Sequence, residues 1–140
     1  MRISAVLLWM IALAAYDVRC RRLPNWLTLP GFAVILLVAT CMGHGVAAIV
    51  GATSLGAAYL SVHVVSPPAM GGGDVKLALG LGALTGCFGT DVWFLAALGA
   101  PLLTTVTAVV AVLRRSGPSV PHGPSMCVAS IAAISLAFLS

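Results

Sequence analysis

Six apolar runs separated by short polar segments make up nearly the whole chain. They cover residues 3–16, 27–42, 46–65, 75–87, 92–113 and 125–139. Runs of this kind predict helices that cross a bilayer, since a span needs about 20 residues for a core of about 30 Å. The fourth run is too short, because about 13 residues extend only about 20 Å. Either Asp74 therefore lies below the membrane surface, or the helix takes in part of the glycine stretch before it.

Prolines, glycines and a threonine mark the predicted helix ends. Pro24 should stop any helix that enters the polar segment 17–25, and Pro30 falls in the first turn of the second predicted helix, where proline is tolerated. Thr90 is the expected N-cap of the fifth helix. In the fourth run, Ala78, Gly82 and Gly86 stand four residues apart. One face of that helix should therefore be smooth enough to pack closely against its neighbours.

The composition places the chain among membrane proteins. Of its 140 residues 61% are hydrophobic and 7% are charged, and glutamate is absent. A soluble domain would be roughly 25% charged. We therefore predict an all-α, polytopic membrane protein with about six transmembrane helices and a single domain over residues 1–140. The net charge of +4 is too sparse for a nucleic-acid-binding surface. The four cysteines form no Cys-x-x-Cys pair, which argues against a zinc site or a disulfide scaffold.

The first run also resembles a signal peptide, with Ala12-Leu13-Ala14 as a candidate cleavage site. We expect it to be retained, because the remainder would still be a membrane protein and because the run ends on Asp17. The basic residues then predict the topology. Loops one, three and five contain Arg19, Arg21, Arg22, Lys76, Arg114 and Arg115. The positive-inside rule puts these loops in the cytoplasm, so that Asp17 and Asp74 lie on one side and Asp91 on the other.

Asp17 and Asp74 are the candidate catalytic residues. Asp74 follows Gly71-Gly72-Gly73, and bare backbone at this point gives an extended substrate room to approach. Two facing carboxyl groups can share one proton, so that one activates a water molecule and the other donates to a peptide carbonyl. The plain alternative is a flexible loop with a helix-capping aspartate.

Three segments, taken in order, resemble motifs of intramembrane aspartic proteases. Gly71-Gly72-Gly73-Asp74 fits the Gly-x-Gly-Asp signature, and with Val75-Lys76 it is most similar to the prepilin peptidases, or type IV leader peptidases. The segment from Asp17 to Leu23-Pro24-Asn25 resembles their first-aspartate motif. Pro121-His122-Gly123-Pro124 resembles their Pro-aromatic-Gly-Pro motif, with His122 in place of the usual aromatic residue.

The resemblance implies cleavage of the short basic leader of prepilins or pilin-like proteins. The reaction would take place at the cytoplasmic face of the plasma membrane, with Asp17 and Asp74 as the catalytic pair and no metal or organic cofactor. The implied partners are the prepilin substrate and the lipid bilayer, and the oligomeric state stays open. Residues expected to bind substrate or support the site are Gly71, Gly73, Lys76, Arg19, Pro24, Asn25, Pro121, Gly123 and Pro124. Of these, Lys76 and Arg19 are expected to act electrostatically.

Larger family members carry an N-terminal cytoplasmic region with paired Cys-x-x-Cys motifs, and they also methylate the new N-terminus. This sequence contains neither that region nor the paired cysteines, so it resembles the short, peptidase-only form, such as those that serve Flp/Tad-type pili. A second class of function is a small proton-coupled transporter, which would need its acid near the bilayer midplane. A third is a structural subunit of a secretion assembly, which would leave the paired acids unexplained.

Overall fold

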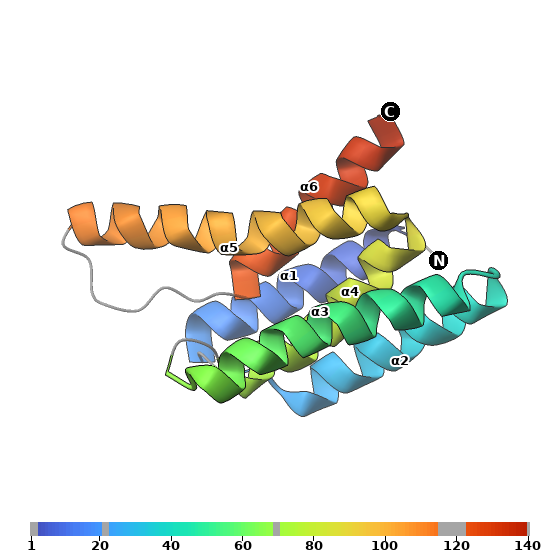
Figure 1. The fold of residues 1–140 in the computed structure, drawn as a ribbon, viewed down its shortest axis with the longest axis horizontal. Helices are drawn as coiled ribbons and strands as arrows, with labels where there is room; N and C mark the ends of the chain where they lie inside the picture. The colour runs from blue at the N-terminus through green and yellow to red at the C-terminus, as the bar shows by residue number, and fades with distance from the viewer. Residues whose placement is uncertain (1–2, 21–22, 69–70, 115–122, 140) are drawn as a thin grey trace.

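The protein folds into a bundle of helices (Figure 1). The structure is a computed structural model that describes residues 3–20, 23–68, 71–114 and 123–139. Within these ranges it contains α1 (Ile3–Cys20), α2 (Asn25–Cys41), α3 (Gly45–Val65), α4 (Gly72–Cys87), α5 (Thr90–Leu113) and α6 (Gly123–Leu139). The all-helical prediction is confirmed.

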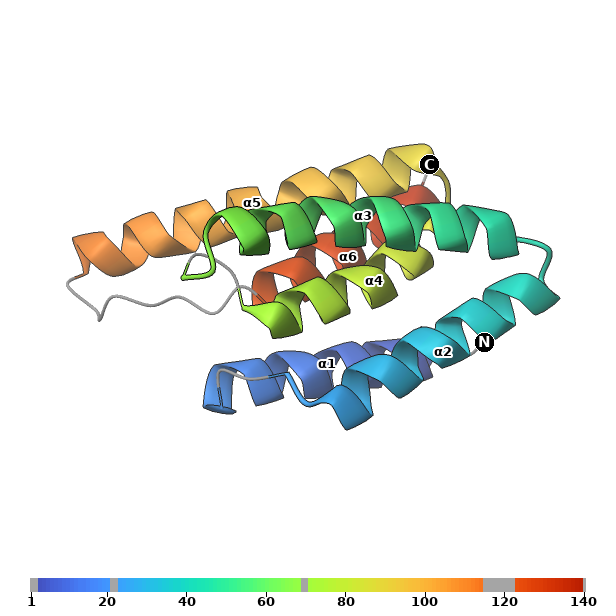
Figure 2. The ribbon, with the colours of Figure 1, turned by 60° about the horizontal axis from the view of Figure 1, so that its bottom comes forward.

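Successive helices run in opposite directions, so the connections gather at two ends of the bundle. The aspartate end comprises the ends of α1, α3 and α5 and the beginnings of α2, α4 and α6 (Figure 1). At the opposite end, short turns join α2 to α3 and α4 to α5. Figure 2 shows α1 and α2 on one side of the bundle and the other helices on the opposite side.

The predicted end of α1 and the predicted beginning of α2 are wrong. α1 does not end at Tyr16 but continues to Cys20, because residues 17–20 include no glycine or proline to interrupt it. α2 begins at Asn25, directly after Pro24, whose extended backbone (φ −70°, ψ 134°) forms the N-cap. Pro30 is therefore inside α2, beyond the first turn.

The beginnings of α4 and α5 also differ from the expectation. α4 takes in Gly72, Gly73 and Asp74, which is the second of the two alternatives considered above. The N-cap of α5 is Gly89 and not Thr90, which is already helical. Gly89 has a φ of +118°, a conformation that glycine adopts at little cost and that threonine would strain.

α4 is the central helix of the bundle. It packs against α2, α3, α5 and α6, and its residues from Leu77 to Thr85 are buried except for the half-buried Leu79. Its approach to α3 is very close: a Cβ atom on Gly82 would lie 3.0 Å from Leu55 Cβ and closer still to the carbonyl oxygen of Gly51. The predicted smooth face of α4 is thus confirmed, and it lets the two backbones touch.

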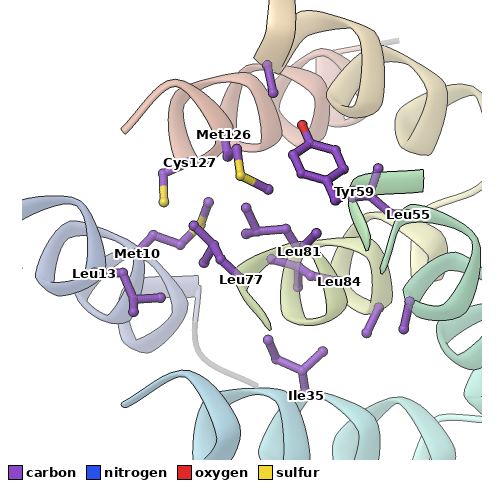
Figure 3. Packing of buried hydrophobic residues seen from close by; sticks show 14 of the residues in the cluster. Met10, Leu13, Ile35, Leu55, Tyr59, Leu77, Leu81, Leu84, Met126 and Cys127 are labelled. Atoms are coloured by element: carbon purple, nitrogen blue, oxygen red, sulfur yellow. The ribbon is translucent and has the colours of Figure 1, made fainter. Parts of the chain in front are cut away.

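Long side chains connect α1 to this centre. Met10 and Leu13 of α1 lie beside Leu77 of α4 and Met126 of α6 in the buried cluster (Figure 3). Nε1 of Trp9 donates a hydrogen bond to the carbonyl oxygen of Leu27 at 2.9 Å. The same ring lies against Gly31 of α2 and Gly80 of α4, where a side chain would collide with it. Trp9 thereby links three helices.

The outer surface is apolar. α3 and α5 are long and apolar enough to cross a membrane, with mean hydropathies of 1.6 and 2.0, and α2 and residues 124–139 of α6 are shorter apolar helices. More than half of the surface of several α5 side chains is exposed, namely Leu95, Leu98, Leu102, Val106 and Val109. Such a surface suits lipid better than water, so the structure is consistent with a membrane protein. The number of helices that cross stays a prediction.

Candidate active site

Asp17 is a buried acid near the end of α1. It is only 7% exposed, and the thiol of Cys127 on α6 lies within range of its charge. Burial disfavours a carboxylate, and the negative end of the helix dipole disfavours it further. Asp17 is therefore an acid placed where a charged carboxylate is costly.

Asp74 occupies the first turn of α4, before the apolar run that begins at Val75. Its N–H donates to the carbonyl oxygen of Gly71 at 3.1 Å, and its carboxylate accepts a hydrogen bond from the N–H of Gly71. This return bond from the third helical residue to the N-cap is one half of a capping box. Asp74 thus caps its helix, as the alternative of a helix-capping aspartate supposed. Capping does not explain why a second acid lies near its carboxyl group.

That second acid is Asp17. Burial and the charge of Asp17 raise the pKa of Asp74 from 3.8 to about 6, against the opposing effect of the Gly71 N–H. Two helices that are distant in the sequence thus bring their acids within electrostatic range of each other. Such a pair holds a proton at a pH where an isolated aspartate has lost it. The third acid, Asp91, is exposed at the start of α5, at the opposite end of the bundle.

Leu23 and Asn25, at the end of the first-aspartate motif, contact the turn that carries Asp74. A Cβ atom on Gly73 would lie 3.0 Å from Leu23 Cβ and 3.3 Å from its backbone nitrogen, so Gly73 makes room for Leu23. Nζ of Lys76 donates to Oδ1 of Asn25 at 2.6 Å. Residues of the two predicted aspartate motifs therefore lie in contact with each other.

The glycines of the second motif have different surroundings. A Cβ atom added to Gly72 would meet nothing within 4 Å, and one added to Gly71 would meet only Oδ2 of Asp74, at 3.7 Å. Both glycines are exposed, whereas Gly73 is half-buried against Leu23. Open backbone is thus found at Gly71 and Gly72.

The remaining predicted residues lie around this centre. Arg19 is exposed in the last turn of α1, where a cation suits the helix dipole. The carbonyl oxygen of Pro24 accepts hydrogen bonds from the N–H groups of Leu27 and Thr28, both at 3.1 Å, and these bonds stabilise the start of α2. Gly123 and Pro124 open α6. Pro121 and His122, with Arg21 and Arg22, lie outside the described residues.

Tyr59 was not predicted from the sequence. It is 7% exposed on α3, and its phenol lies within range of the Asp74 charge. Figure 3 shows its ring on the α3 side of the cluster that contains Leu77 and Leu81. A tyrosine inside an apolar run carries no signal of its own, and only the packing of α3 on α4 brings it near Asp74. His63, one turn further along α3, is half-buried and has an interaction partner.

The sequence profile of the type IV leader peptidase family matches residues 4–114, a range that includes both aspartates. The chain belongs to the type IV leader peptidase family. The resemblance inferred from the motifs is thus confirmed. Membership in this family indicates a peptidase, hence a hydrolase, and does not favour a proton-coupled transporter. Searches of curated proteins and of solved structures give no match.

Proposed function

We propose that this chain is a membrane-embedded aspartic endopeptidase that removes the basic leader of type IV or Flp-type prepilins. Asp17 and Asp74 form its catalytic pair, and cleavage takes place at the cytoplasmic face of a plasma membrane that all six helices cross. The observation that carries the proposal is the electrostatic interaction between the two carboxyl groups, which come from different helices of a peptidase-family chain.

The pair can catalyse hydrolysis by sharing one proton. The ionised carboxylate removes a proton from water as the water oxygen attacks the scissile carbonyl carbon, while the protonated carboxyl donates its proton to the carbonyl oxygen. The resulting tetrahedral intermediate collapses when the peptide nitrogen takes the proton of the pair and the C–N bond breaks, while a hydroxyl group of the intermediate passes its proton back to the pair. The products are a carboxylic acid and a free amine, and the pair again holds one proton.

The surroundings support access by an extended peptide. Gly71 and Gly72 are exposed and free of side-chain bulk beside Asp74, so substrate backbone can come close to the carboxyl groups there. The apolar outer surface of the bundle suits a substrate that is itself anchored in the bilayer. Its basic leader would then reach the site from the cytoplasm.

Asparagine variants test the proposal. Purified protein in liposomes would be mixed with a prepilin that has a basic leader, a glycine and an apolar helix, and leader loss would be followed on gels. Asp17→Asn and Asp74→Asn should each lower the rate by about 10²–10⁴. The double variant should be scarcely worse, because the two groups act as a unit on one water molecule.

Asp91→Asn is the matched control, since it removes the one remaining acid at the opposite end of the bundle. It should cleave at the wild-type rate. Asparagine keeps the shape of aspartate, so all variants should accumulate in the membrane at similar levels. A well-inserted Asp74→Asn protein that still removes the leader would refute the catalytic assignment.

A further inference from the structure

We propose that Lys76 and Asn25 are positioning residues, and that their hydrogen bond holds the two catalytic carboxyl groups at their working separation. This inference rests on the proposed function and adds a role for two residues that do not themselves touch the reacting atoms. It differs from the electrostatic support expected of Lys76 from the sequence alone.

The packing of the two helices that carry the acids shows why such a device is needed. The backbone of α1 packs mainly against α6, and that of α4 against α2, α3, α5 and α6. α1 reaches α4 through long side chains, such as Trp9 against Gly80. Long side chains do not fix a separation as firmly as touching backbones do. The position of Asp17 relative to Asp74 therefore depends largely on the contacts that join residues 23–27 to the first turn of α4.

Two contacts form that tie. Lys76 lies two residues after Asp74, and Asn25 is the first residue of α2, so their 2.6 Å hydrogen bond joins the two motifs directly. A hydrogen bond from an ammonium group is shorter and stronger than one between neutral groups. Beside it, Leu23, which is buried, rests on the bare backbone of Gly73.

Residues 23–27, which include Asn25, also contact α1, so they can transmit a change of position to it. The rings of Tyr16, in the last turn but one of α1, and Trp26, in the first turn of α2, meet edge to face with centroids 6.0 Å apart. Nε1 of Trp9 on α1 donates a hydrogen bond to the carbonyl oxygen of Leu27 on α2. A shift of Asn25 relative to Lys76 would thus be passed to α1 and to Asp17.

The Asp74 carboxyl interacts with Asp17 from α1 and with the N–H of Gly71 from its own turn, and its charge reaches the phenol of Tyr59 on α3. The ammonium of Lys76 is engaged by Asn25 from α2. A positioning role and a charge role for Lys76 therefore predict different behaviour for a variant that keeps the ammonium but removes its acceptor.

The experiment compares Asn25→Leu, Lys76→Met, the double variant and Asn25→Asp in the prepilin assay. Asn25→Leu and Lys76→Met should each lower kcat/KM by about 10- to 100-fold, because small displacements of catalytic groups cost rates of this order. The double variant should be no worse than either single one. Asn25→Asp should keep most of the activity, since its carboxylate can accept the same hydrogen bond. Arg114→Met, which removes an exposed cation at the same end, should leave the rate unchanged.

A titration independent of cleavage completes the test. In an Asp91→Asn background, Asp17 and Asp74 are the only side-chain carboxyl groups in the chain, so infrared difference spectra report on this pair. Loosening the pair should weaken the effect of Asp17 and lower the pKa of Asp74 in both Asn25→Leu and Lys76→Met. Loss of a supporting cation would instead raise that pKa in Lys76→Met and leave Asn25→Leu unchanged.

The outcomes separate the two proposals. Wild-type cleavage and titration in Asn25→Leu, with an impaired Lys76→Met, would overturn the positioning role and favour the charge role. If the wild-type chain removes no leader, the proposed function fails, and the infrared titration still decides whether the bond holds the pair. Asn25→Asp, which retains the acceptor, shows whether any loss of activity in Asn25→Leu comes from misfolding of residues 23–27.

Discussion

Replacing Gly82 with alanine should separate the two most closely packed helices of the bundle. The added methyl group would lie 3.0 Å from Leu55 Cβ and from the carbonyl carbon of Gly51, and closer still to the Gly51 oxygen, whereas ordinary contacts are 3.4–4 Å. The Gly51 carbonyl belongs to the helix backbone and cannot rotate away. α3 must therefore move back from α4 by at least a few tenths of an ångström along a buried interface.

The expected cost follows from two opposing effects. Overpacking a close interface costs about 1–3 kcal/mol, while alanine is better than glycine inside a helix by up to about 1 kcal/mol. The net destabilisation should be about 1–2 kcal/mol, which lowers the folded-to-unfolded ratio about 5- to 30-fold. Leader cleavage should fall as well, because the displaced α4 carries Asp74.

Unfolding in mixed micelles, followed by tryptophan fluorescence, measures this change. Trp93 is a suitable reporter because its Nε1 donates to the Gly51 carbonyl oxygen at 3.0 Å, on the surface that must move. Gly72→Ala is the matched control in the same helix, since nothing lies within 4 Å of its added Cβ, and it should stabilise by about 0.4–1 kcal/mol. A Gly82→Ala protein as stable as Gly72→Ala would refute the close packing of α3 and α4.

Two further predictions concern pH and topology. The pKa of Asp74 is raised to about 6, so the pair loses its shared proton as the pH rises through that value. The kcat/KM for leader cleavage should therefore fall there. A rate that stays flat from about pH 5 to pH 8 would contradict the shared-proton mechanism. In a cysteine-free background, an impermeant maleimide added outside the cell should label Thr90→Cys at the opposite end but not Ser66→Cys at the aspartate end. Labelling of Ser66→Cys from outside would reverse the predicted orientation.

The sequence by itself determined the number of helices and their approximate places. Long apolar runs must be buried or face lipid, and helices satisfy their own backbone hydrogen bonds, so local pattern is enough. The scarcity of acidic residues also pointed to the site. The chain contains only three, and two of them, Asp17 and Asp74, lie in family-like motifs that are predicted to be on the same side of the membrane. The family itself was predicted from the same motifs and was confirmed by the match over residues 4–114.

Only the tertiary structure decided what each glycine, helix end and polar residue does. Gly72, Gly73 and Gly82 look alike in the sequence, yet one faces open space, one accommodates Leu23 and one touches the backbone of α3. The bond between Lys76 and Asn25 and the approach of Tyr59 to Asp74 likewise depend on residues far apart in the chain. Local sequence determines where the chain turns and which helix faces are apolar. Which residues contact one another across helices is determined by the packing of the whole bundle.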